Sequence, residues 1–244
     1  MANSTSLLSC SLLFLCAACT AAFEPIDAPL DALGLAAADA GGQDRRQISG
    51  EDIAAAFAQA EQMHLPARLA VARLGETRRG RTVAATSFAT VPTPELELVE
   101  ARLAKGTVWS SITPLSPLFA GSQSPNLNQL RLEAARTHAD LLLVYGLNGS
   151  EAYRPNALAV LNLALLPAFL LPGSDVETGT VGGMALVDVR NGHVYAMSGV
   201  EDWRAGTAPS AAKESVLATL HTESRRDVLG RMLDSVRTQL DRRQ

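Results

Sequence analysis

The sequence has little cysteine and no excess of basic residues, and each of these features excludes a class of protein. Its three cysteines, at positions 10, 16 and 19, all lie near the N-terminus, so the rest of the chain cannot form a disulfide framework or a thiolate metal site. The 25 acidic residues outnumber the 21 basic ones, of which only Lys105 and Lys213 are lysines, so the net charge is −4. This argues against nucleic acid as a partner, because phosphate binding needs a basic surface.

Sequence motifs of catalysis are missing as well. The four histidines, at positions 64, 138, 193 and 221, form no HExxH pair. The chain also has no GxSxG elbow and no glycine-rich phosphate loop. We therefore predict no catalytic residue, no metal ligand and no cofactor, and we expect the protein not to be an enzyme.

The N-terminus carries a short apolar segment, residues 7–19, which is uncharged and shorter than the ~20 residues that a membrane-spanning helix needs. It matches the apolar region of a secretory signal. Ala17 and Ala18, immediately before Cys19, resemble the lipobox of bacterial lipoproteins. That resemblance implies a signal peptide over residues 1–18, a lipid on Cys19 and, with Thr20 next, a place at the periplasmic side of the outer membrane. Cleavage after Ala22 without a lipid is the alternative.

The next segment, residues 20–49, contains two prolines and a Gly-Gly pair and has no sustained helical or strand period. We interpret residues 19–49 as the lipid anchor and a flexible tether, with a root-mean-square reach of roughly 30 Å. The remaining residues, 50–244, suffice for one domain with a substantial core.

Hydrophobic periodicity predicts an α/β domain, a mixed sheet with helices packed on it. In the first half, strands and helices alternate: a helix from Ser49 to about 64, a strand over 67–74, a loop over 75–93, a helix from Thr93, a strand over 108–113, a helix after Asn126 and a strand over 141–147.

The second half favours an antiparallel hairpin near residues 181–200 and a long C-terminal helix. Asn191-Gly192 suits a type I′ turn, because both residues tolerate positive φ. The helical pattern begins beyond Pro209 and is expected to break near Thr222. One face of this helix is apolar: Val228, Leu229, Met232, Leu233, Val236 and Leu240.

Candidate binding residues come from three places. Residues 157–172, which include Phe169, are almost wholly apolar and are either a buried strand and loop or a surface that touches lipid or a partner. Trp203 is either an exposed contact residue or a side chain that closes the end of the sheet. Asn191, in the hairpin turn, is the third candidate.

The acidic residues Asp175, Glu177 and Glu201 flank the hairpin. They are either solvated or, if they converge, the site of a periplasmic hydrolase or small-ligand binder.

Two stretches carry a family resemblance: QLRLEAARTHADLLLVYGL at 129–147 and GMALVDVRNGHVYAMSG at 183–199. Together they resemble the rhombotarget lipoproteins of bacteria and, more loosely, envelope domains related to the curli-secretion lipoprotein and the TolB N-terminal domain. The resemblance implies a non-catalytic binding or assembly component of the cell envelope, anchored in the membrane by its lipid and in contact with an envelope protein. A secretion-channel subunit is a further alternative that it allows.

Overall fold

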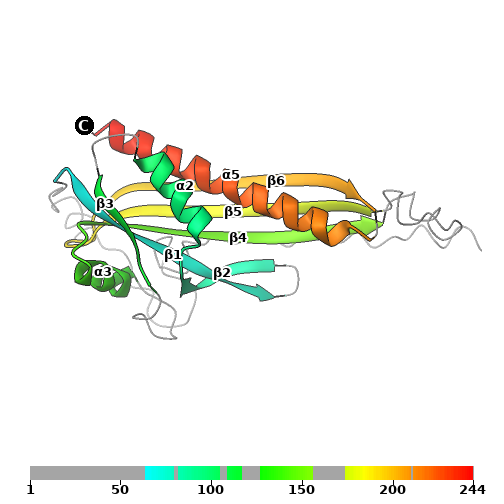
Figure 1. Ribbon diagram of the computed structural model, residues 1–244, viewed down its shortest axis with the longest axis horizontal. Helices are drawn as coiled ribbons and strands as arrows, with labels where there is room; N and C mark the ends of the chain where they lie inside the picture. The colour runs from blue at the N-terminus through cyan, green and yellow to red at the C-terminus, as the bar shows by residue number, and fades with distance from the viewer. Residues whose placement is uncertain are drawn as a thin grey trace, which may run out of the picture.

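A six-stranded sheet lies at the centre of the computed structural model, which describes residues 64–79, 82–104, 109–116, 127–155, 174–209 and 211–243 (Figure 1). The strands follow the order β3-β1-β2-β4-β5-β6 across the sheet. Their bounds are Ala67–Arg79 (β1), Thr82–Ala89 (β2), Trp109–Pro114 (β3), Leu141–Pro155 (β4), Ser174–Asp188 (β5) and Val194–Ala208 (β6). The described helices are α2 (Thr93–Leu103), α3 (Leu127–Arg136) and α5 (Lys213–Asp241).

The sheet is mixed, as predicted. β1 runs parallel to β3 and, in its first half, to β4, and it is antiparallel to β2. β4, β5 and β6 form a long antiparallel meander. The chain therefore combines a parallel crossover region with a hairpin sheet, and the α/β prediction is confirmed.

Helices cover both faces of this sheet. The larger core cluster joins α2 and α5 to one face, with Tyr145, Met184 and Leu186 of the sheet among its buried members. The smaller cluster joins Leu130 and Ala134 of α3 to the opposite face. The predicted apolar stripe of the C-terminal helix is confirmed, since all of its members are buried: Val228, Leu229, Met232, Leu233, Val236 and Leu240.

The hairpin is confirmed and is longer than expected, with 15 residues in each strand. Its turn differs from the prediction. Gly192 has a φ of +79°, but His138 is the only described residue other than glycine with a positive φ, so Asn191 does not adopt the type I′ conformation. Instead, Asp188 Oδ1 accepts hydrogen bonds from the N–H groups of Arg190 and Asn191, at 2.8 and 3.3 Å. A short acidic side chain thus organises the turn through local hydrogen bonds.

Three other boundaries differ from the expectation. The predicted loop over 75–93 is wrong, because β1 continues to Arg79 and β2 returns antiparallel to it. β4 extends to Pro155 because its ladder with β5 continues that far. The expected break at Thr222 is wrong too: α5 is continuous over 29 residues, and the Thr222 hydroxyl donates to the Ala218 carbonyl within the helix, at 2.8 Å.

The strands near 67–74 and 108–113 and the helices after Thr93 and Asn126 are confirmed. The predicted signal peptide and tether (1–49), the helix from Ser49 and the apolar stretch over 157–172 lie outside the described residues.

Candidate functional site

The strand β6 presents alternate side chains to two different environments. A Cβ atom at Gly182, on the neighbouring β5, would come within 2.5 Å of Val228 and 2.8 Å of Met232, so this side of the sheet faces α5. On β6, Asp202 and Arg204 point to the same side. Because side chains alternate along a strand, Glu201 and Trp203 point away from α5.

We call this opposite side the Trp203 face. It is formed by the odd-numbered residues of the two strands: Asp175, Glu177, Gly179 and Val181 on β5, and Met197, Gly199, Glu201, Trp203, Ala205 and Thr207 on β6. All the β6 members are exposed, and Trp203 retains 50% of its accessible surface.

Trp203 lies across a glycine. Gly179 is its register partner on β5, and a Cβ atom there would collide with the six-membered ring of the indole. The glycine therefore permits the ring to lie close to the strand backbone. The exposure of Trp203 favours the interpretation as a contact residue over that of a side chain closing the sheet end.

The acidic residues flanking the hairpin share this face but are spread along it. Asp175 pairs with Thr207, Glu177 with Ala205, and Glu201 with Val181. Glu201 thus lies four residues along β6 from the partner of Glu177, roughly 13 Å at ~3.4 Å per residue. The register does not bring the three carboxylates together at one point.

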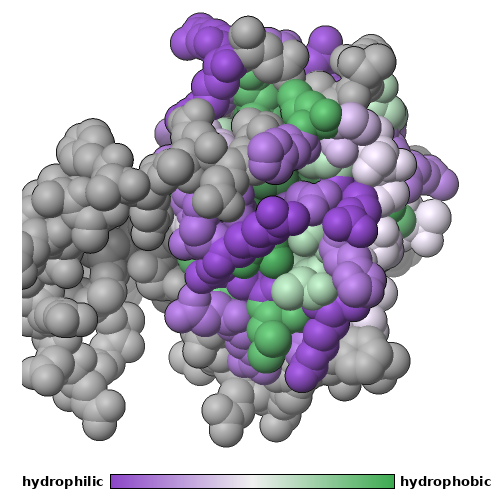
Figure 2. Space-filling model, turned by 90° about the vertical axis from the view of Figure 1, so that its left-hand side faces the viewer, coloured by the Kyte–Doolittle hydropathy of each residue, from purple (hydrophilic) through white to green (hydrophobic). Residues whose placement is uncertain are grey.

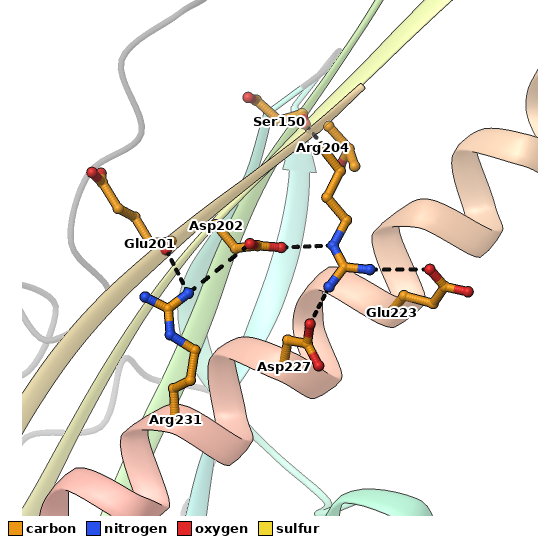
Figure 3. A network of polar contacts seen from close by, with 8 residues as sticks. Ser150, Glu201, Asp202, Arg204, Glu223, Asp227 and Arg231 are labelled. Atoms are coloured by element: carbon orange, nitrogen blue, oxygen red, sulfur yellow. Dashed lines mark hydrogen bonds and ion pairs between the residues drawn. The ribbon is translucent and has the colours of Figure 1, made fainter. Parts of the chain in front are cut away.

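Polar contacts between β6 and α5 occupy the other side of the strand (Figure 3). Arg204 forms ion pairs with Asp202 at 2.7 Å, with Glu223 at 3.0 Å and with Asp227. Arg231 of α5 lies 4.0 Å from the Asp202 carboxylate. Burial raises the pKa of Asp202, but the hydrogen bond and the charge of Arg204 outweigh it and hold that pKa below its ordinary value.

A second polar centre, which sequence reasoning missed, surrounds Glu95 in the first turn of α2. One carboxylate oxygen accepts hydrogen bonds from Arg73 of β1 at 2.8 Å and from the Tyr145 hydroxyl of β4 at 2.6 Å. The other lies 3.4 Å from Arg225 of α5. Burial, together with the charge of Glu95, raises the pKa of Tyr145, so its hydroxyl stays protonated and donates.

A cleft of about 580 Å³ lies above this centre, between α2 and α5. Its walls are largely apolar, with Pro92, Pro94, Leu98 and Leu229 among the lining residues. No local sequence signal could have indicated the centre, since the four residues that meet there come from four different elements.

A third cluster lies at the end of the molecule that carries the hairpin turn. Asp140 pairs with Arg68 at 3.2 Å and with Arg190 at 3.6 Å, and the hydrogen bond from Arg68 lowers the pKa of Asp140. Figure 2 shows this end, where hydrophilic side chains cover much of the surface between smaller hydrophobic areas. The cluster joins the starts of β1 and β4 to the turn.

The predicted binding residues are not brought together. Asn191 lies in the turn, where its side chain accepts a hydrogen bond from the His193 N–H at 2.8 Å. Trp203 is nine residues beyond the start of β6, which is roughly 30 Å along the strand. Phe169 and Cys19 lie outside the described residues. Their roles, like those of Asn191 and Trp203, stay predictions.

The described ranges contain no metal-binding group of side chains and no helix able to cross a membrane. No group of three or more His, Cys, Asp or Glu side chains there is placed to hold a metal ion. Within the same ranges, no helix combines the length and apolar composition needed to cross a membrane.

Comparison with known proteins identifies no family. No family model matches the sequence, and no curated protein matches it significantly. The resemblance to rhombotarget lipoproteins therefore stays a hypothesis.

Several solved structures are similar to this chain at low sequence identity and low TM-score. They include the L103M variant of a PelC dodecamer from Paraburkholderia phytofirmans (17% identity over 68% of this chain and 87% of that one, TM-score 0.32). Rare lipoprotein B from Shewanella oneidensis is 14% identical over 72% and 99% of the two chains, with a TM-score of 0.35. Lipoprotein GNA1162 from Neisseria meningitidis is 12% identical over 65% and 97%, also with a TM-score of 0.35. Similarity at this level carries no functional argument.

Proposed function

We propose that this chain is a lipid-anchored protein on the periplasmic side of the bacterial outer membrane, and that it acts by binding another protein of the cell envelope. The anchor rests on the sequence: an uncharged apolar segment of signal-peptide length, two alanines and then Cys19. The binding role rests on the Trp203 face.

The observation that carries the binding role is the exposure of Trp203 on the side of β6 that faces away from α5. Large aromatic side chains are buried on average, and they are enriched among the residues that dominate protein interfaces. Trp203 is half exposed, and Met197 on the same face is 43% exposed. Between them lie the small residue Gly199 and the acidic Glu201, so a partner can approach the strand closely.

Metabolic labelling with palmitate tests the anchor. The wild-type protein should incorporate label and fractionate with outer membranes, and Cys19→Ala should do neither. Cys16→Ala is the matched control, because it also removes a thiol but leaves the predicted acceptor, and it should retain the label. Equal labelling of the two variants would contradict the assignment of Cys19.

Site-specific crosslinking in the native envelope tests the binding face. A photo-reactive amino acid at position 203 should give a discrete adduct with one envelope protein, identified by mass spectrometry. The same amino acid at Thr219, exposed on α5, is the control and should not give that adduct. The binding role is wrong if both positions yield the same products, or if excess unlabelled Trp203→Ala protein competes as well as the wild type.

A further inference from the structure

The outer side of β6 is an edge of the described sheet. Side chains of α5 form hydrogen bonds with some of the backbone groups along this edge. Gln239 donates to the Met197 carbonyl at 2.7 Å and accepts from the Met197 N–H at 3.3 Å, as a neighbouring strand would. Arg231 donates to the Glu201 carbonyl at 3.2 Å. These contacts show that the backbone groups of odd-numbered β6 residues point outward, since backbone direction alternates along an antiparallel strand.

The last part of the same edge has no such cover. The backbone N–H and C=O groups of Ala205 and Thr207 point outward, as those of Met197 do. Within the described chain, these groups have no backbone or side-chain partner. Both side chains are exposed. Proteins usually block an edge strand with charge, proline or a covering element, because unpaired backbone groups accept another strand. Here no blocking contact within the described chain reaches Ala205 or Thr207.

Acidic and aromatic groups surround this uncovered stretch. The carboxylates of Glu201 and Glu177 are not engaged in the hydrogen bonds or ion pairs of the described residues, and both lie on the Trp203 face. A residue opposite Trp203 on an added strand would have its Cβ about 5 Å from that of Trp203. A cation there would meet the indole, the best aromatic partner for cations, and the charge of Glu201.

A buried hydroxyl on the same face also lacks a partner. Ser150 of β4 pairs with Gly179, is 4% exposed, and its Oγ makes no hydrogen bond. In Figure 3 its side chain points away from α5, as does that of Glu201. Buried hydroxyls nearly always form a hydrogen bond. Ser150, Gly179 and Trp203 are register partners on three neighbouring strands, so the unbonded Ser150 hydroxyl lies on the same line across the sheet as the exposed indole.

We infer that the 205–207 edge of β6 binds an extended, basic segment of a partner protein by strand addition, with lysine or arginine side chains of that segment against the exposed side of Trp203 and against Glu201. The inference rests on the proposed function and specifies the chemistry of the partner. Backbone hydrogen bonds to Ala205 and Thr207 supply affinity, and the acidic, aromatic face selects the charge of the segment. This charge complementarity favours a basic peptide over a second copy of this chain as the occupant.

A defined peptide pair tests the charge preference with the full chain. The probe is a fluorescein-labelled decapeptide of alternating lysine and threonine, and the control is its glutamate–threonine counterpart. Fluorescence anisotropy should show binding of the basic peptide that weakens with salt, and no binding of the acidic one at the same concentration. Equal binding of both peptides, or binding of neither, overturns the inference.

Proline substitution tests the backbone contacts. Ala205→Pro removes an outward N–H and leaves the ladder to β5 intact, so it should weaken binding of the basic peptide about tenfold, as expected for loss of one or two hydrogen bonds. Ala205→Val is the matched control, since it keeps the N–H, and should bind within about twofold of the wild type. If circular dichroism shows that Ala205→Pro is unfolded, Thr207→Pro replaces it, because the N–H of Thr207 also points outward.

The outcomes separate this inference from the proposed function. If the adduct at position 203 persists in Ala205→Pro, the partner still binds the face and strand addition is wrong. If the basic peptide binds as expected but no envelope adduct forms, the strand-addition site exists and the envelope role is wrong. A wild-type dimer in light scattering that Ala205→Pro converts to monomer makes a second copy the occupant and overturns the basic-peptide assignment.

Discussion

Glu201 and Asp202 are adjacent and equally charged, yet they have opposite surroundings. Asp202 faces α5, where Arg204 binds its carboxylate and Arg231 lies nearby. Glu201 faces the other way, and among the described residues its one hydrogen bond is from Arg231 to its backbone carbonyl (Figure 3). The two sides of β6 therefore differ in role: one holds α5 on the sheet, and the other presents side chains to solvent.

The difference shows that the side of β6 to which a polar side chain points, more than its residue type, determines whether it forms ion pairs with α5. α5 supplies Glu223, Asp227 and Arg231 to one side of β6 only. An acidic residue of one parity is therefore neutralised inside a helix–sheet interface, while its neighbour is available for contacts with other molecules.

The largest expected effect comes from comparing two glycines at which an added side chain would point to opposite sides of the sheet. Gly182→Val should destabilise the protein by about 1–3 kcal/mol, because the new side chain would displace Val228 and Met232 and push α5 off the sheet. Gly199→Val should change stability little, since the nearest atom to a Cβ there is 4.0 Å away. Urea unfolding measures both, and equal destabilisation would remove the distinction between the two sides.

A smaller effect is expected from removing a charge on each side. Arg204→Met keeps most of the aliphatic stem but leaves Asp202, Glu223 and Asp227 without their shared cation. We expect a loss of about 1 kcal/mol, in part recovered at high salt because screening weakens the repulsion. Glu201→Gln should stay within ~0.5 kcal/mol of the wild type. A larger cost for Glu201→Gln would show that this carboxylate has a structural partner.

The smallest effect is a pH dependence confined to the α5 side. The pKa of Asp202 in the folded protein is lower than its ordinary value of 3.8, so its contribution to stability is present above that pH and is lost as the pH falls through the folded pKa. The free energy of unfolding should therefore decline less below about pH 4 in Asp202→Asn than in the wild type. Matching pH profiles of the two proteins in urea titrations would contradict the role of Asp202.

Local patterns accounted for much of the fold. The apolar stripe of α5 repeats with the helical period, and Pro94 and Glu95 are typical of a first helical turn, so each could be recognised from neighbouring residues alone. The hairpin was predictable for the same reason, though its turn was not, because the Asp188 carboxylate determines the turn conformation. β2 was missed because its signal is weak without the pairing to β1.

The candidate sites depended on contacts between distant parts of the chain. Trp203 was recognisable as a candidate, but its exposure depends on the register that places it over Gly179 and on the side that α5 covers. Glu95 was visible only as an acidic residue near a helix start, and its partners Arg73, Tyr145 and Arg225 are brought to it by three other elements.

By itself, the sequence determined where most helices and strands form, because the hydrophobic periods of helices and strands can be recognised within about ten neighbouring residues. Tertiary structure alone decided which side of β6 is covered, which carboxylates are neutralised and which part of the sheet edge stays uncovered. These depend on strand register and on where α5 packs, and both are set by the summed burial of residues far apart in the chain.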